Sequence, residues 1–233
     1  NRFVYVSCNE RFNDEFLLRY SKNEEIKSLN KIEHPILRET LKYYKNSLHA
    51  QIGLEITSIA DVPGGTGLGS SGAFGVALQS TLRRYLSLNS SKNELAKQST
   101  FIEMNRLKRK IGLQDQYISS YGGLSKFKVS KNGIVKVSKA KISLSLRDSI
   151  ANDLQLIYLG SIRDAESLLS IQDKEIKSNK KIGNISFSDI VDLGKEMYES
   201  FSKNDFEQFA SLTNEYWNFK RERQKKSTPK LAN

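Results

Sequence analysis

Two short segments near the start of the chain alternate between positions of different character. In residues 3–7, Val4 and Val6 alternate with aromatic and polar side chains, and in residues 52–56 every other position is isoleucine or leucine. Since successive side chains of a strand point to opposite faces, this period of two predicts a β-strand in each segment. Residues 34–44 instead place apolar side chains roughly on one helical face, so they predict a helix.

Helical spacing of apolar residues follows the second strand. Residues 74–86 carry apolar side chains at this spacing and predict an amphipathic helix. Residues 91–94, Ser-Lys-Asn-Glu, have the pattern of a capping box and predict a second helix that runs to about Lys110. Further on, residues 126–142 predict a hairpin, in which Asn132-Gly133 supplies the positive backbone angles of a tight turn.

The rest of the chain predicts a turn-rich interruption and then a second mixed unit. The interruption covers residues 111–123. After the hairpin the patterns predict a strand at 154–160, a helix at 162–176 and two more helices around 190–201 and 209–219. A change of character near Asn152 predicts two domains, residues 1–151 and 152–233, with mixed α-helices and β-strands.

The charge of the chain raises the question of a nucleic-acid partner. Its 233 residues are long enough to bury a core, and its formal net charge is +11, which would suit a phosphate backbone or small anionic substrates. The cations are interleaved with acids along most segments, however, which favours a solvated surface. Tyr216, Trp217 and Phe219 lie beside a basic run, but their helical spacing predicts core packing rather than base stacking.

Cysteine and histidine usage excludes several classes of site. Cys8 is the only cysteine, so the chain has neither an internal disulfide nor a cysteine zinc cluster. His34 and His49 are isolated, which favours structural or exposed roles over metal ligation. No apolar run reaches membrane-spanning length and no signal peptide is visible, so we expect a cytoplasmic protein.

The segment PGGTGLGSSG, residues 63–72, carries the chemistry of the chain. It places five glycines and two serines directly before the helix predicted at 74–86. Backbone N–H groups of such a loop, together with the positive end of the helix dipole, can cradle phosphates. A P-loop needs a lysine that is absent here, and the chain has no H-R-D or D-F-G motif of a protein kinase. We therefore predict a phosphate-binding loop that relies on a metal ion for its remaining positive charge.

Two alternatives from other classes stay open on these residues. Gly67, Gly69 and Gly72 spell the dinucleotide fingerprint of an oxidoreductase, but that fold needs a strand after the helix, where we predict a second helix. The other alternative is a basic module that binds nucleic acid without chemistry. It predicts strongly salt-dependent oligonucleotide binding.

Glu103 is a candidate independent of the loop. It follows Ala96 and Thr100 and precedes Leu107 at helical spacing, so its carboxylate shares a face with small or apolar residues. A carboxylate that faces inward needs hydrogen bonds or a cation, which is either a metal ion or an arginine or lysine side chain.

Several segments together resemble one family. PGGTGLGSSGAF resembles the second motif of the GHMP kinases, P-x-x-x-G-L-G-S-S-A-A, which wraps the phosphates of ATP. GLQDQYISSYGGL resembles the G-K-Q-D-Q-Y-x-A-x-x-G-G segment of the heptose-phosphate kinase branch, and NRFVYVS, HPILRETL and YLGSIRDAESLLSIQ are similar to the same branch. Gly72 replaces the usual Ala or Ser, which is expected to weaken the helix start slightly, and Leu113 replaces the Lys of the heptokinase form.

The resemblance implies an α+β fold and a kinase reaction. The first domain would have the ribosomal S5 domain 2-like fold, and the second would be a partial α+β domain. The reaction would transfer the γ-phosphoryl group of ATP to a sugar hydroxyl, the anomeric hydroxyl of heptose 7-phosphate, with galactose, fucose or mevalonate as other acceptors in the family. A small sugar or sugar phosphate would be the partner, with no nucleic acid or membrane. The first and third family motifs would precede Asn1 and follow Asn233, so we expect a fragment with weak nucleotide affinity and no catalysis of its own.

The resemblance also implies roles for individual residues. Asp115 would be the catalytic residue that accepts the proton of the sugar hydroxyl or holds that hydroxyl in line. Ser71 and Glu103 would bind Mg²⁺. The ATP phosphates would be held by Pro63, Gly64, Gly65, Thr66, Gly67, Leu68, Gly69, Ser70, Ser71 and Gly72. The substrate would be oriented by Gln114, Gln116, Tyr117 and Tyr121.

Overall fold

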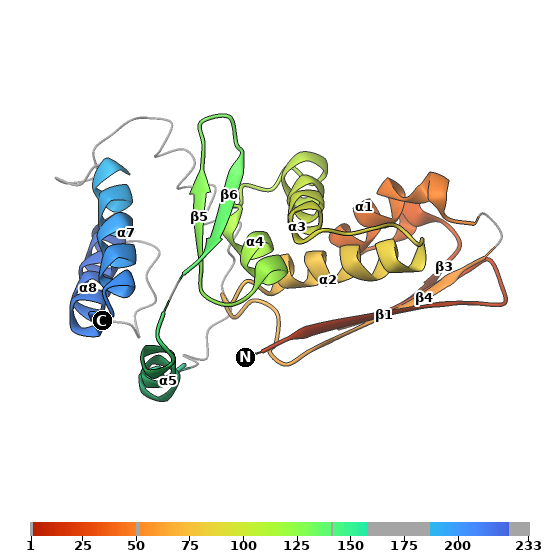
Figure 1. The fold of residues 1–233 in the computed structure, drawn as a ribbon. Helices are drawn as coiled ribbons and strands as arrows, with labels where there is room; N and C mark the ends of the chain where they lie inside the picture. Colours follow the sequence, from red (N-terminus) through yellow and green to blue (C-terminus); the bar gives the residue numbers. More distant parts are fainter. Residues whose placement is uncertain (1, 50–51, 141, 158–186, 224–233) are drawn as a thin grey trace. The chain divides into compact units, whose positions relative to one another are not determined.

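The structure is a computed structural model that describes residues 2–49, 52–140, 142–157 and 187–223 (Figure 1). The described residues up to Gly122 form one compact unit, and those from Gly123 onward form a second. Both contain helices and strands, which confirms the mixed fold class. The proposed domain limits, 1–151 and 152–233, stay a prediction.

The first unit is built on a four-stranded sheet. Its strands are β1 (Val4–Glu10), β2 (Phe16–Arg19), β3 (Asn23–Ile26) and β4 (Leu54–Ala60). They lie in the order β1-β4-β2-β3, with β4 antiparallel to β1 and parallel to β2. The alternation of the sequence explains the inner face, because Val4 and Val6 pack against the core while Tyr5 is 54% exposed. The strand predicted at residues 3–7 is therefore confirmed.

The strand predicted from residue 52 begins two residues later, at Leu54. Gly53 explains this difference, because it lies against the chain between β1 and β2. Its N–H donates to the carbonyl of Asn13 at 2.7 Å, and a Cβ atom at Gly53 would lie 2.0 Å from the carbonyl oxygen of Glu15. A glycine is thus required for the close approach that precedes the strand.

Helices cover this sheet and complete the core. They are α1 (Pro35–Tyr43), α2 (Ser70–Tyr85), α3 (Lys92–Phe101) and α4 (Gln114–Tyr121), with the short turns η1 (Leu29–Lys31), η2 (Lys45–Ser47) and the π-helical η3 (Ile102–Arg106). Figure 1 shows α2 lying along β1 and β4, and the Thr81 hydroxyl donates to the carbonyl of Val6 at 3.0 Å. Leu78 and Leu82 of α2 are fully buried against the sheet.

Two helix starts agree with the sequence patterns. Pro35 is the first residue of α1, and Nδ1 of His34 accepts a hydrogen bond from the N–H of Leu37. Burial, and then the charge of Arg109, lower the pKa of His34, so the neutral imidazole is available as an acceptor at pH 7. Ser91 forms the expected capping box with Glu94 at the start of α3. The structural role of His34 is confirmed.

Three features of the first unit differ from the sequence-based expectation. β2 and β3 were not predicted. The helix from Ser91 does not run to Lys110: its α-helical part ends at Phe101, where the hydrogen bonding widens into η3. Residues 114–121, expected to be turn-rich, form α4, which ends at Gly122 with a φ of 67°.

The second unit contains a hairpin of β5 (Ser125–Val129) and β6 (Val135–Lys139), followed by α5 (Leu144–Asp153), α7 (Phe187–Ser202) and α8 (Phe206–Arg223). The hairpin and the last two helices confirm the predictions. The turn was described wrongly, because Gly133 has a φ of 78° whereas Asn132 is not among the residues of positive φ. The pairing of Val129 with Val135 leaves a longer loop, in which the N–H of Gly133 donates to Ser130. α5 was not predicted.

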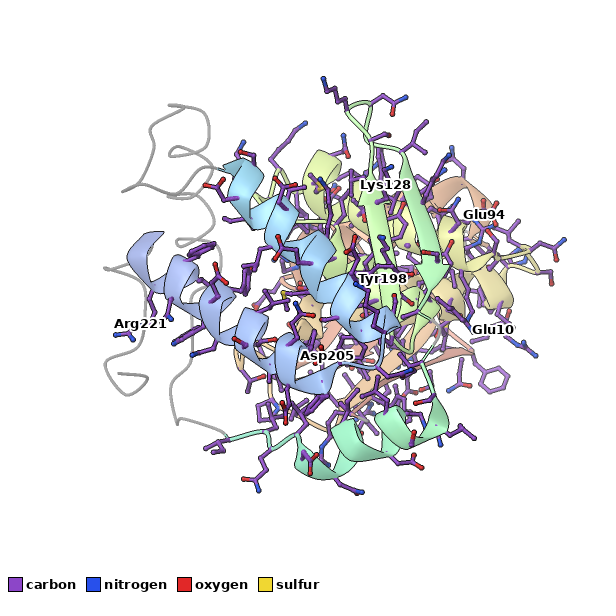
Figure 2. All side chains as sticks on the ribbon, turned by 60° about the vertical axis from the view of Figure 1, so that its left-hand side comes forward. Glu10, Glu94, Lys128, Tyr198, Asp205 and Arg221 are labelled. Atoms are coloured by element: carbon purple, nitrogen blue, oxygen red, sulfur yellow. The ribbon has the colours of Figure 1, made fainter. Side chains whose placement is uncertain are left out.

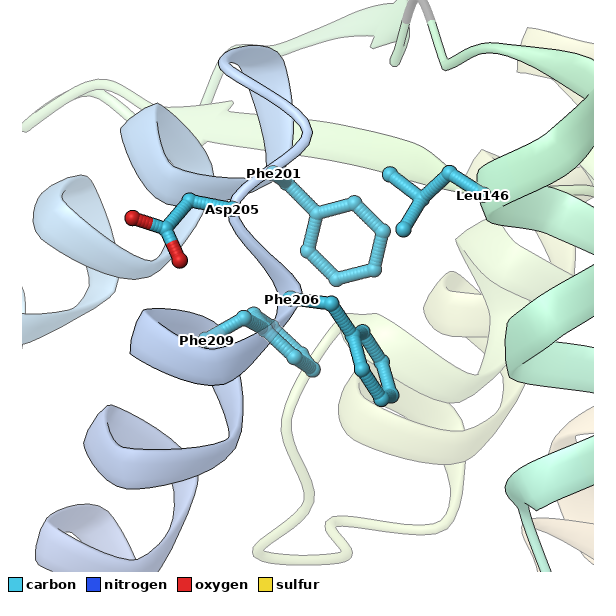
Figure 3. Close-up of a pocket in the computed structure, with 5 residues that line it drawn as sticks. All are labelled: Leu146, Phe201, Asp205, Phe206 and Phe209. Carbon is cyan, nitrogen blue, oxygen red and sulfur yellow. The ribbon is translucent and has the colours of Figure 1, made fainter.

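Aromatic side chains hold α7 and α8 together. Phe201 and Phe209 meet edge to face, with ring centroids 4.1 Å apart, and Figure 3 shows them with Leu146 and Phe206 around a gap that has no room for a water molecule. This gap is a core contact rather than a ligand site. On α7, Tyr198, which Figure 2 labels, has the ammonium group of Lys126 over its ring, 3.6 Å from the ring centroid.

Other expectations for this half of the chain are only partly met. Trp217 and Phe219 are half-buried, but Tyr216 is 39% exposed, so its assignment to the core was wrong. Residues 154–157 are neither helix nor strand, contrary to the strand predicted there. Residues 158–160 and the helix predicted at 162–176 lie outside the described residues. Over the described ranges, no helix combines the length and apolar character needed to cross a membrane.

Candidate active site

The glycine loop links β4 to α2 and ends at the N-terminus of that helix. Gly65, Gly67 and Gly69 have φ values of 79°, 78° and 71°, a region that other residues rarely adopt. Thr66 closes the loop on itself by donating its hydroxyl to the carbonyl of Pro63 at 3.1 Å. These positive angles explain why the segment needs glycine at alternate positions.

The start of α2 offers backbone donors to an anion. Gly69 is the N-cap and no side chain caps the helix, and the first helical bond runs from the N–H of Ala73 to the carbonyl of Gly69 at 3.0 Å. The preceding N–H groups, on Ser70, Ser71 and Gly72, therefore stand ahead of the helical ladder. Such N–H groups and the positive end of the helix dipole favour phosphate binding.

Glu103 lies at the centre of a side-chain network beside this helix start. It is fully buried in η3. Its Oε2 accepts hydrogen bonds from Ser71 Oγ at 2.9 Å and from Arg109 Nη1 at 3.1 Å, and its Oε1 accepts one from Gln116 Nε2 at 2.7 Å. The structure thus brings Ser71 and Glu103 together. It also shows that Arg109 is the cationic partner of this inward-facing carboxylate.

The π-helical turn explains how Arg109 reaches Glu103. The N–H of Leu107 donates to the carbonyl of Ile102 and the N–H of Arg109 to the carbonyl of Glu103, both at 3.0 Å. Lys108 between them has a φ of 57°, which turns the chain back on itself. Sequence reasoning missed Arg109, because α-helical spacing relates residues three or four apart and not six. The one available signal was that a buried carboxylate needs a cation.

Asp115 lies against the glycine loop. It is in the first turn of α4, not in a turn beyond a helix as expected. A Cβ atom at Gly69 would lie 3.1 Å from Cγ of Asp115, and one at Gly72 would lie 2.7 Å from Cβ of Asp115. The glycine at position 72, where the resembling family has Ala or Ser, therefore allows the close approach of α4 to α2.

The surroundings of Asp115 raise the pKa of its carboxyl group. Loss of hydration against the loop, and then the negative charge of Glu103, raise the pKa of the Asp115 carboxyl group above its usual range. A higher pKa makes the carboxylate a stronger base than an ordinary exposed aspartate.

This pKa shift predicts a pH-dependent cost in stability. Because the pKa of Asp115 is higher in the folded chain than in the unfolded chain, the free energy of unfolding falls as the pH rises above the unfolded value of about 3.9. Asp115→Asn should therefore raise Tm at pH 7, by up to about 2 °C since the side chain keeps part of its contact with solvent. Thermal denaturation across pH 4 to 8 measures this difference, which should shrink towards zero in acid. An offset of the same size at every pH would contradict it.

The residues expected to orient substrate lie on α4 in different environments. Gln114 is exposed, whereas Gln116 is 1% exposed and is engaged with Glu103. Tyr117 is buried, and the ring of Tyr121 stacks parallel to it with centroids 6.2 Å apart.

The oxygen atoms of Ser71 and Glu103 are hard ligands that suit Mg²⁺. Among the described residues, no group of three or more His, Cys, Asp or Glu side chains could hold a metal ion. A magnesium ion at this place would therefore take its other ligands from water or from phosphate oxygens, as is common for this ion.

The order of elements disfavours the dinucleotide-binding alternative. That fold requires a strand after the helix that follows the glycines. Here α2 is followed by α3, a helix with its own capping box. The match of Gly67, Gly69 and Gly72 to the fingerprint is therefore fortuitous.

Comparisons with known proteins agree with this geometry. Residues 35–123 match the family model described as the GHMP kinases N terminal domain. The D-glycero-alpha-D-manno-heptose 7-phosphate kinase of Campylobacter jejuni is 25% identical over 208 residues, which are 89% of this chain and 58% of the relative. The chain thus spans less than two thirds of the length of that relative.

Solved structures with the same fold come from several kinases. A D-glycero-D-manno-heptose 1-phosphate kinase from Bacteriodes thetaiotaomicron has a TM-score of 0.64 at 19% identity, over 94% of this chain and 67% of that chain. The galactokinase of Lactococcus lactis, complexed with galactose, has a TM-score of 0.58 at 12% identity, over 90% and 64%. Residues 35–123 therefore match the N-terminal domain of the GHMP kinases, and this chain has the fold of these kinases.

Proposed function

We propose that this chain is the nucleotide-binding part of a cytoplasmic sugar kinase, which transfers the γ-phosphoryl group of ATP to the anomeric hydroxyl of heptose 7-phosphate. The observation that carries the proposal is the packing of Asp115 against Gly69 and Gly72. It puts a carboxylate of raised pKa directly beside the loop that would hold the phosphates. The heptose-phosphate kinases among the relatives support the choice of sugar.

Some residues of the site would bind the ATP phosphates, and others would bind the metal ion. The loop from Pro63 to Gly72, with the N–H groups that open α2, would bind the ATP phosphates. Ser71 and Glu103 would hold Mg²⁺, which when bound neutralises charge on the phosphate oxygens. In this arrangement Gln116 holds Glu103 by its hydrogen bond at 2.7 Å.

Asp115 would act on the sugar. Its carboxylate accepts a hydrogen bond from the attacking hydroxyl, orients it towards the phosphate site and takes its proton as the new bond forms. The raised pKa favours the proton-accepting role, because base strength rises with pKa. Gln114, Tyr117 and Tyr121 on the same helix would help to orient the sugar.

Turnover by the full-length protein tests the proposal. ADP release is measured with Mg–ATP and heptose 7-phosphate, galactose, fucose or mevalonate as acceptor. We expect turnover with heptose 7-phosphate alone. Turnover with another acceptor would keep the kinase and change the substrate. A folded protein that turns over none of them, but binds oligonucleotides with a steep salt dependence, would instead be a nucleic-acid-binding module.

A further inference from the structure

We propose that Arg109 and a divalent cation compete for the charge of Glu103, because the guanidinium group is bonded to the carboxylate oxygen that faces Ser71. This role of Arg109 rests on the proposed function in one respect, namely that Glu103 is a metal ligand. The resulting exchange would make binding of free metal weak. It would favour metal that binds together with nucleotide, because the phosphate oxygens of the nucleotide supply further ligands.

Two side chains already donate hydrogen bonds to Oε2 of Glu103. Ser71 Oγ lies 2.9 Å from this oxygen and Arg109 Nη1 lies 3.1 Å from it, while Gln116 takes the other oxygen. A carboxylate oxygen has two lone pairs, and these two donors use both. A cation that binds between Ser71 and Glu103 would take the lone pair now used by the Ser71 hydroxyl, and the positive guanidinium group on the same oxygen would repel it.

The charges explain why the position is filled when no metal is bound. Glu103 is 0% exposed, and an ionised carboxylate in such a place is very unfavourable without a counter-charge. In the described part of the chain, its one ion pair is with Arg109. Arg109 thus provides the neutralising charge that a metal ion would otherwise provide.

The two partners differ in their access to water. The side chain of Arg109 is 23% exposed, whereas that of Glu103 is 0% exposed. Within the described ranges, one hydrogen bond, at 3.1 Å, holds the guanidinium group, so this group can turn outwards and regain hydration. The carboxylate stays in place, because Gln116 also holds it. The exchange therefore requires movement of the arginine side chain but not of the carboxylate.

The same turn of the chain offers a matched control. Arg106 is the last residue of η3, three positions before Arg109, and its side chain is 32% exposed, but its guanidinium group pairs with Glu39 at 3.0 Å. Arg106→Gln removes the same charge from the same segment without touching Glu103. It separates a local effect on the metal position from a general change in net charge.

Binding of Mn²⁺ without nucleotide tests the competition directly. The full chain, Arg109→Gln, Arg106→Gln and the double variant Arg109→Gln with Glu103→Gln are titrated with Mn²⁺, and free Mn²⁺ is followed by electron paramagnetic resonance. We expect Arg109→Gln to bind at least about tenfold more tightly than the unaltered chain, which corresponds to about 1.4 kcal/mol. Arg106→Gln should bind like the unaltered chain, and the double variant should lose the gain.

Thermal stability supplies a second readout. Arg109→Gln should lower Tm in the absence of metal and regain stability as Mn²⁺ is added, whereas the unaltered chain should not respond to the same concentrations. If Arg109→Gln does not fold, Arg109→Lys replaces it, with a smaller gain in affinity expected because lysine lacks the planar fork of arginine.

Two results would overturn the proposal: a folded Arg109→Gln variant that binds Mn²⁺ no more tightly than the unaltered chain, or a gain that survives Glu103→Gln. These failures are distinct from failure of the kinase assignment. If no acceptor is turned over but Arg109→Gln binds Mn²⁺ more tightly in a way that depends on Glu103, the competition between Arg109 and metal is supported and the kinase assignment is not. If an acceptor is turned over but Arg109→Gln binds Mn²⁺ no more tightly, only the competition between Arg109 and metal is rejected.

Discussion

Asp115→Asn is expected to lower kcat of the proposed sugar kinase by about 10²- to 10⁴-fold, the usual contribution of a positioned general base. The amide has almost the same shape as the carboxylate, so α4 should keep its packing against Gly69 and Gly72. It cannot accept the proton of the sugar hydroxyl. Because the ATP phosphates would be held by the loop, we expect the affinity for ATP to change little. Steady-state kinetics and a nucleotide titration of the full-length protein measure both quantities.

Asp14→Asn is the control for this substitution. Asp14 belongs to the same unit, is exposed and pairs with Lys27 at 3.2 Å, and the proposed site does not use it. It should leave kcat within about twofold, since exposed ion pairs contribute little. A folded Asp115→Asn protein with full kcat would reject the role given to Asp115 and leave the phosphate loop unaffected.

Gly72→Ala is expected to lower both stability and activity, although alanine is the better helix former. Helix propensity alone would favour alanine by about 1 kcal/mol. Against this, the new Cβ would lie 2.7 Å from Cβ of Asp115, 3.1 Å from its carbonyl carbon and 3.2 Å from the backbone nitrogen of Gln116. Two of these are backbone atoms of α4, so the helix itself must shift. Overpacking of this kind typically costs about 1–3 kcal/mol, which outweighs the propensity.

The shift of α4 should also displace Asp115 and so lower the reaction rate. A displacement of about 1 Å at a catalytic group can lower the rate about 10²-fold, so kcat should fall by that order. Urea denaturation and steady-state kinetics measure the two effects. Gly194→Ala is the control, because Gly194 is on the exposed face of α7 with no atom within 4 Å of an added Cβ. It should raise stability by up to about 1 kcal/mol and leave kcat unchanged. Equal gains in stability from both substitutions would contradict the close packing at Gly72.

The parts of the fold that follow from local rules could be predicted from the sequence. The capping box at Ser91 and the glycine loop ahead of α2 depend on residues a few positions apart. β3 could not be predicted in this way, because its buried residue is Glu24. That carboxylate accepts hydrogen bonds from the hydroxyl of Tyr20 and the N–H of Glu33, partners that lie on other segments.

The site shows the same limit. Spacing alone indicated that Glu103 faces inward, and the loop was recognisable from its glycines. The three partners of Glu103 come from α2, from the chain beyond η3 and from α4, so only the folded chain reveals them together. α4 was missed because its Ser-Ser-Tyr-Gly-Gly ending is typical of turns, and burial of Gln116 and Tyr117 supports the helix instead.

α3 and α4 are joined at both ends. At one end Ser120 Oγ donates to the carbonyl of Lys92 at 2.5 Å and Lys92 Nζ donates to the carbonyl of Tyr121 at 3.1 Å. At the other end Gln116 is bonded to Glu103, just beyond α3. The two acids are thus carried by segments that are bonded to each other at both ends, and Gly69 and Gly72 lie against Asp115. These bonds would keep the separation constant, when a ligand binds, between the acid that would bind metal and the acid that would receive the proton.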